Sequence, residues 1–233
     1  MAAIPSWMLD KSAIVFPHAR LLRSVLWTTL ILLTLSLPVQ AEQARVRWVP
    51  DGDTIHLEDG RRVRLLGIDT PELGRDGTPD QYYARESRDG LRRLIDGRRI
   101  RLETDGQGED RFGRLLASVF LADGRMVNEV LVEQGLAFFY PHSHQKRDFQ
   151  QRMLEAQQRA IMSRSGFWPR ILALPQPPAG WVGNRRSKRF HHPESHSADR
   201  ISPRNRVVLH SLEQAFLEGF APVRHRSPWP DAD

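Results

Sequence analysis

The sequence predicts an α+β fold built around a small closed β-barrel. Five short segments rich in β-branched and alternating hydrophobic residues are separated by turn signals, which is typical of short strands. Segments with helical spacing follow the third and the fifth of these strands. The chain has 233 residues, of which 40 % are hydrophobic and 27 % charged, and this suits one globular domain with extensions.

The expected strands are bounded by residues that favour tight turns. Glu58–Arg61 contains Gly60, which is free to take a positive φ, and Asp123-Gly124 marks a second turn. Five strands are enough to close a small barrel. The expected strands are Arg45–Val49, Thr54–Leu57, Arg62–Ile68, Arg99–Glu103 and Leu115–Leu121.

Three helices are expected around the barrel and a fourth near the end of the chain. In the first, Tyr83, Ser87, Leu91 and Leu94 recur at spacings of three and four residues. The second stops at Gly135, a residue type favoured just after a helix. The expected helices are Tyr82–Ile95, Val127–Gln134, Asp148–Met162 and the amphipathic segment Val207–Phe220.

Residues 1–41 are expected to be a signal peptide. The run Ser24–Pro38 is uncharged and rich in Leu, and it is shorter than the roughly 20 residues that span a bilayer. Basic residues precede it, and cleavage is expected after Ala41. The mature protein would then be secreted or periplasmic, with no stable membrane span. An uncleaved anchor and a buried core helix are the alternatives.

The remaining chain divides at residue 169, where the composition changes. Residues 42–169 form the expected barrel domain, and residues 170–233 form an extension whose role the sequence leaves open. Pro175–Pro178 is expected to be a linker. The basic run Arg185–Arg189 is interpreted as a solvated linker, with extra contacts to nucleic acid as the alternative.

Charge and cysteine content exclude several classes of function. Residues 42–168 carry 21 Lys or Arg and 21 Asp or Glu, so the sequence pI of about 10.4 comes from the two ends of the chain. The pI therefore gives no argument that the barrel binds nucleic acid. The absence of Cys excludes a disulfide scaffold, a cysteine nucleophile and a thiolate zinc site.

Acidic residues gather at the ends of the expected strands. Asp51, Asp53, Asp69 and Glu72 lie in two turns, and Arg64 lies in the strand between them. Such a cluster repels itself unless a cation is present, and calcium takes oxygen ligands of this kind. Ordinary turn formation is the alternative explanation for each piece.

A third segment adds a second arginine. Arg114 stands where a Gly-containing turn enters a strand, a position from which its guanidinium could bind a phosphate through two hydrogen bonds. Two arginines and several carboxylates are the groups that phosphodiester cleavage needs.

These segments resemble the staphylococcal-nuclease-like family. The matching stretches are VPDGDTIHL, RLLGIDTPE, EDRFGRLLASVFLADGRMVNEVLVEQGLA and SGFWP, in that order, over Ala44–Pro169. The resemblance implies a five-stranded barrel of the OB type with three helices. It also implies a calcium-dependent endonuclease that cleaves single- or double-stranded DNA, RNA or both. The protein is expected to be a monomer.

The resemblance assigns roles to six residues. Asp53 and Asp69 match metal-binding carboxylates, and the backbone carbonyl of Thr70 matches a further ligand. Arg64 and Arg114 match the catalytic arginines, and Glu72 matches the carboxylate that activates the attacking water. The implied reaction is in-line attack of water on phosphorus, which leaves 3′-phosphate ends.

Substrate contacts are expected from three further residues. Arg111 and Phe112 stand where relatives carry a Lys-Tyr pair that contacts nucleotide, and Tyr140 is expected either to stack on a base or to be part of the core. Two other functions stay open. One is a noncatalytic nucleic-acid-binding barrel, and the other is a surface protein that is anchored by residues 1–41 and recruits partners through its tail.

Overall fold

The computed structural model describes residues 42–224 and 228–232. The expected signal peptide lies outside these residues. In the part of the chain that is described, no helix is both long enough and apolar enough to cross a membrane.

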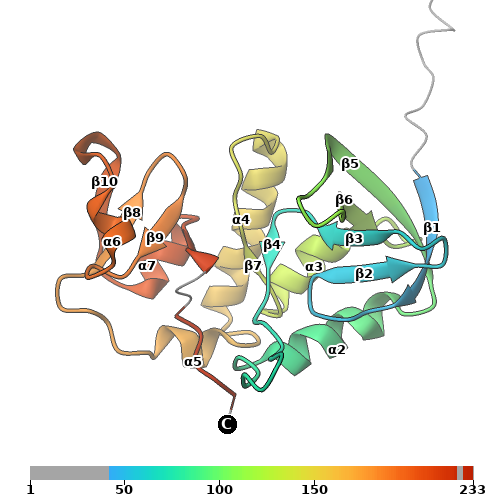
Figure 1. Ribbon diagram of the computed structural model, residues 1–233, viewed down its shortest axis with the longest axis horizontal. Helices are drawn as coiled ribbons and strands as arrows, with labels where there is room; N and C mark the ends of the chain where they lie inside the picture. Colours follow the sequence, from blue (N-terminus) through green and yellow to red (C-terminus); the bar gives the residue numbers. More distant parts are fainter. Residues whose placement is uncertain (1–41, 225–227, 233) are drawn as a thin grey trace, which may run out of the picture. The chain divides into compact units, whose positions relative to one another are not determined.

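Five strands close into a barrel, as the sequence predicts (Figure 1). Their order is β1-β2-β3-β6-β5, and antiparallel pairing of β1 with β5 closes the ring. The pair β3 and β6 is parallel, whereas the other neighbours are antiparallel. The strands are β1 (Glu42–Trp48), β2 (Thr54–Leu57), β3 (Arg62–Leu65), β5 (Arg99–Glu109) and β6 (Leu115–Phe120). The α+β class with an OB-type barrel is confirmed.

The expected strand Arg62–Ile68 is in fact two strands. Gly67 adopts a φ of +72°, and a Cβ at this position would lie 2.5 Å from the ring of Phe149. The left-handed conformation turns the chain out of the barrel. The following strand β4 (Ile68–Asp69) pairs with β7 (Phe138–Phe139) in a separate small sheet. The break therefore places Asp69 in this small sheet and not in the barrel strand β3.

Three helices pack against the barrel at the places that the sequence predicts. They are α2 (Ala84–Ile95), α3 (Val127–Glu133) and α4 (Arg147–Met162). Gly135 follows α3 with a φ of +63°, as expected for a residue just after a helix. The inward faces of the helices and strands form one core that includes Ile55, Leu65, Leu91, Val119, Leu131 and Met153.

The segment after residue 169 folds with the barrel domain and is not an extended linker. The helix α5 (Trp168–Leu172) spans the expected boundary. The extension then forms a four-stranded sheet of order β10-β8-β9-β11. Its elements are β8 (Trp181–Asn184), β9 (Arg189–His191), α6 (His196–Asp199), η1 (Pro203–Asn205), β10 (Arg206–Leu209), α7 (Leu212–Leu217) and β11 (Ala221–Pro222).

Two expectations for this extension are wrong. The basic run Arg185–Arg189 is the turn between β8 and β9 and the first residue of β9, and the expected helix Val207–Phe220 is a strand followed by a short helix. The β-branched pair Val207 and Val208 bonds to β8, which a helix would not allow. Ser211 then starts α7 by accepting a hydrogen bond from the Gln214 backbone N–H at 3.0 Å.

A second apolar cluster joins the extension to the barrel domain. It contains Phe138, Tyr140 and Phe167 from before residue 169, and Phe216 and Trp229 from after it. The rings of Phe138 and Trp229 are stacked with centroids 4.9 Å apart, and Phe216 meets Phe138 edge to face at 5.8 Å. The extension therefore shares a core with the domain that carries the candidate site.

Candidate active site

A groove at one end of the barrel collects most of the residues that the sequence singles out. Its volume is about 580 Å³. We call it the arginine groove because six arginines line it. It is lined by Arg62, Arg64, Arg75, Arg111, Arg114 and Arg224, together with Asp51, Asp53 and Glu72 and with Trp48, Pro50, Thr54, His56 and Phe112.

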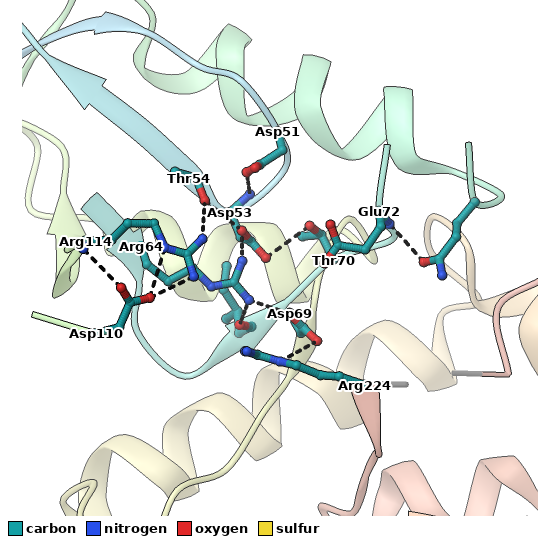
Figure 2. Close-up of polar contacts among 12 residues, drawn as sticks. Asp51, Asp53, Thr54, Arg64, Asp69, Thr70, Glu72, Asp110, Arg114 and Arg224 are labelled. Carbon is teal, nitrogen blue, oxygen red and sulfur yellow. Dashed lines mark hydrogen bonds and ion pairs between the residues drawn. The ribbon is translucent and has the colours of Figure 1, made fainter. Parts of the chain in front are cut away.

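Arg64 bridges two buried carboxylates at the floor of the groove (Figure 2). It lies on β3 with 6 % of its surface exposed. Its Nη1 pairs with Asp53 and its Nη2 with Asp69, and Nη2 also donates to the Ile68 carbonyl at 3.2 Å. Burial lowers the pKa of Arg64, and the charge of Asp69 opposes this shift. One guanidinium thus compensates two carboxylates that are shielded from water.

The Asp-Gly-Asp-Thr turn is fixed against Thr70, the residue that follows β4. The Asp53 backbone N–H donates to Asp51 Oδ1 at 3.2 Å, and Thr70 Oγ1 donates to Asp53 Oδ2 at 3.2 Å. A Cβ at Gly52 would lie 2.8 Å from Thr70 Oγ1, so only glycine allows the turn to approach this closely. The close approach brings the Asp53 carboxylate near Asp69, so that Arg64 pairs with both.

Arg114 is held in a fixed orientation by Asp110. Its Nε and Nη2 donate to Asp110 Oδ2 at 2.9 and 2.8 Å, while Nη1 donates to Thr54 Oγ1 at 3.2 Å. The backbone N–H groups of Phe112 and Arg114 donate to Asp110 Oδ1 at 2.9 and 3.0 Å. Burial raises the pKa of Asp110, but the hydrogen bonds from Arg114 outweigh it and hold that pKa below its ordinary value. The turn therefore presents Arg114 to the groove before any ligand binds.

Glu72 differs from the other acids because its carboxylate is not engaged. In residues 42–224 and 228–232, no hydrogen bond or ion pair reaches this carboxylate, although its backbone N–H donates to Gln81 Oε1 at 2.9 Å. Glu72 is exposed by surface area, but the surrounding protein still removes part of the water around its carboxylate. Burial, followed by the charge of Asp69, raises the pKa of Glu72. A carboxylate that is free to accept a proton suits a general base.

The chemistry of the donors fits a hard cation, although side chains alone do not form a metal site in the part of the chain that the structure describes. Asp53, Asp69 and the Thr70 carbonyl offer oxygen atoms only, which suits calcium. Among the described residues, no three His, Cys, Asp or Glu side chains are arranged so that they could hold a metal ion. The guanidinium of Arg64 forms ion pairs with both aspartates.

The three expected substrate contacts lie in different surroundings. Arg111 and Phe112 line the arginine groove. Phe112 is 53 % exposed, and the guanidinium groups of Arg111 and Arg114 lie 4.7 and 5.4 Å from its ring centroid. Tyr140 is 8 % exposed, and the guanidinium of Arg189 lies 3.6 Å from its ring centroid. Little of the Tyr140 ring is therefore open to a base, in line with the core alternative.

Sequence reasoning did not find two contributors to the site. Asp110 could have been found, because it stands four residues before Arg114 at a turn. Arg224 could not, since it lies more than fifty residues beyond SGFWP, the last matching stretch, and no motif surrounds it. Its Nε lies 3.7 Å from Asp69 Oδ2.

Comparison with known proteins identifies relatives of this chain. A family model described as "Staphylococcal nuclease homologue" matches residues 62–170. The chain is 39 % identical over 126 residues to a thermonuclease of Staphylococcus hyicus, covering 52 % of this chain and 72 % of the relative. It is 38 % identical over 140 residues to a thermonuclease of Staphylococcus intermedius, covering 58 % and 81 % respectively. An uncharacterized endonuclease of Escherichia coli O157:H7 is 37 % identical over 116 residues, covering 48 % and 71 %.

Proposed function

The chain belongs to the staphylococcal nuclease family, and from this we propose that it is an exported, calcium-dependent endonuclease. Nuclease activity has the support of relatives that are named thermonucleases and endonucleases. The single observation that carries the proposal is the arginine groove, in which Arg64, Arg114, Asp53 and Glu72 converge, with Asp69 paired to Arg64 beside it. The substrate is DNA, RNA or both.

The buried acids and the two arginines have separate tasks in the proposed reaction. Asp53, Asp69 and the Thr70 carbonyl would hold calcium, which when bound supplies positive charge next to the phosphate. Arg64 would leave the aspartates and bind the equatorial oxygens of the phosphate together with Arg114. The fixed pairing of Arg114 with Asp110 keeps one guanidinium oriented for this contact.

Glu72 would act on the attacking water. Its carboxylate accepts a proton from water, the water oxygen bonds to phosphorus, and the bond from phosphorus to the 5′-oxygen breaks. The leaving 5′-oxygen takes up a proton from solvent, to which Glu72 returns the proton that it accepted, and a 3′-phosphate remains on the other product. The raised pKa of Glu72 makes it a better proton acceptor than an ordinary exposed carboxylate.

Export rests on the sequence before Glu42. The proposed signal peptide of residues 1–41 would be removed after Ala41, and the mature protein would be secreted or periplasmic. N-terminal sequencing of the protein recovered outside the cytoplasm is expected to begin at Glu42. A protein that retains residues 1–41 would instead be anchored.

The decisive experiment is cleavage of labelled single-stranded DNA by the chain from Glu42 onward. Because the extension shares a core with the barrel, the tested protein keeps it. Cleavage is expected with calcium and is expected to stop with excess chelator. Glu72→Gln and Arg114→Ala are each expected to lower kcat by about a hundredfold or more.

A matched control separates the site from general charge effects. Arg125 is an exposed arginine that pairs with Asp123 across a Gly turn, as Arg114 pairs with Asp110, but it does not line the groove. Arg125→Ala is expected to cleave like the unmodified protein. DNA binding without cleavage under any divalent ion would instead support a noncatalytic nucleic-acid-binding barrel.

A further inference from the structure

The extension brings one more arginine to the edge of the arginine groove. Arg224 follows β11, whose Ala221 backbone N–H donates to the Lys188 carbonyl at 2.9 Å. Five residues later, Trp229 is buried in the apolar cluster that joins the extension to the barrel domain. The residue is thus tied to the fold on both sides. It also lies outside residues 62–170, the part of the chain that the family model matches.

The guanidinium of Arg224 points to the buried aspartate that Arg64 already neutralises (Figure 2). Its Nε lies 3.7 Å from Asp69 Oδ2, and its Cζ lies 4.9 Å from the ring centroid of Tyr140. These contacts give the side chain a direction. The ion pair is long, however, and half of the Arg224 side chain is exposed.

Arg224 also lies where two hollows of the surface meet. It lines the arginine groove and a neighbouring pocket of about 130 Å³. The arginines that line both hollows are Arg64, Arg114 and Arg224. A strand that passes along these hollows would therefore meet all three guanidinium groups.

The charges around Arg224 favour an anion as its partner. Arg64 has two carboxylates and Arg114 has Asp110, whereas Arg224 shares the one carboxylate of Asp69 with Arg64. Its positive charge is thus only partly compensated. A phosphodiester has two non-bridging oxygens, which a guanidinium can bind through two parallel hydrogen bonds.

We propose that Arg224 is a third phosphate-binding arginine of the active site, supplied by the extension, and that it binds the substrate strand beside the scissile phosphate. This inference rests on the proposed nuclease function. Because Arg64 and Arg114 serve the scissile phosphate in that function, Arg224 contributes to binding of the strand more than to the chemical step. Loss of Arg224 should then raise KM and leave kcat nearly unchanged.

The test measures binding of a fluorescent single-stranded DNA 12-mer by the chain from Glu42 onward. Anisotropy is recorded in EDTA, where the strand is not cleaved, at several salt concentrations from low ionic strength upward. Arg224→Ala and Arg224→Gln are each expected to bind on the order of tenfold more weakly than the unmodified protein. The slope of log K against log salt is expected to fall by about 0.7, the amount for one phosphate contact on a single strand.

Arg204→Ala is the matched control, because Arg204 is exposed in η1 of the same extension and lines neither hollow. It is expected to retain the affinity of the unmodified protein. Arg224 variants that bind and cleave like the unmodified protein would overturn the inference, and so would an equal loss in Arg204→Ala.

A kinetic measurement in calcium completes the test and separates the two proposals. A raised KM with kcat retained in Arg224→Ala supports the inference. Cleavage by the unmodified protein with no change in Arg224→Ala would leave the nuclease proposal standing and remove Arg224 from it. If the unmodified protein cleaves under no divalent ion, the nuclease proposal fails, and the anisotropy series alone then decides whether Arg224 contacts a phosphate.

Discussion

Replacing Arg64 tests whether one guanidinium holds the acidic floor of the site together. In Arg64→Ala, the buried carboxylates of Asp53 and Asp69 lose the cation that both contact. Removing one partner of a buried ion pair costs about 3–5 kcal/mol, because the other charge is left uncompensated. For a chain of this size, we expect the melting temperature in EDTA to fall by about 6–20 °C.

Calcium should reverse part of this loss. A divalent cation bound by the two aspartates would supply the charge that the guanidinium no longer provides, and it would not have to displace Arg64. Because a ligand that binds the folded state stabilises it, saturating calcium should stabilise Arg64→Ala more than it stabilises the unmodified protein. The assay is urea unfolding followed by tryptophan fluorescence, in EDTA and again in calcium.

Two further variants make the result specific. Arg61 also pairs with two acids, Glu42 and Asp59, but all three side chains are exposed, so Arg61→Ala should cost no more than about 1 kcal/mol. Arg64→Met keeps most of the side-chain volume and should still lose stability in EDTA. A loss in Arg64→Ala no larger than in Arg61→Ala, or equal protection of both proteins by calcium, would refute the reasoning.

Three other substitutions probe how the site is supported. Asp110→Asn removes the charged acceptor that orients Arg114 and should lower kcat by about tenfold to a hundredfold with little change in melting temperature, and an unchanged kcat would argue against this positioning role. Trp229→Ala should cost about 3–5 kcal/mol in urea unfolding. It should also speed hydrogen exchange at the Tyr82 amide, which donates to the Pro230 carbonyl at 2.8 Å. Unchanged exchange there would show that burial of Trp229 is not needed to keep this hydrogen bond. Gly67→Ala places a side chain at a φ of +72° against a phenylalanine ring and should cost about 2–4 kcal/mol, whereas a neutral effect would show that the turn can relax.

Most of the barrel could be predicted because its signals are local. Strand β2 has the expected boundaries, and α2, α3 and α4 begin and end within two residues of the expected helices. Turn residues and hydrophobic periodicity are properties of neighbouring residues, so a single sequence carries them. The split of Arg62–Ile68 was missed because the left-handed turn at Gly67 is set by packing against Phe149.

The extension shows the opposite case. Val207–Phe220 has helical periodicity, yet its first residues pair with β8 and form a strand. The partner strand lies about 25 residues earlier in the chain, so local propensity could not decide between the two structures. The same holds for the basic turn between β8 and β9, which looks like a solvated linker when it is considered alone.

The sequence by itself determined the barrel through turn residues and hydrophobic periodicity. It determined the family and the residue types of the candidate site through short motifs such as Asp51–Thr54 and Asp69–Glu72. Only the tertiary structure decided how these groups are paired. Arg64 neutralises two aspartates at once, Asp110 orients Arg114, and the extension brings Arg224 to Asp69. The physical reason is that ion pairs and burial depend on distances in space between residues that are far apart in the chain, and no local pattern encodes those distances.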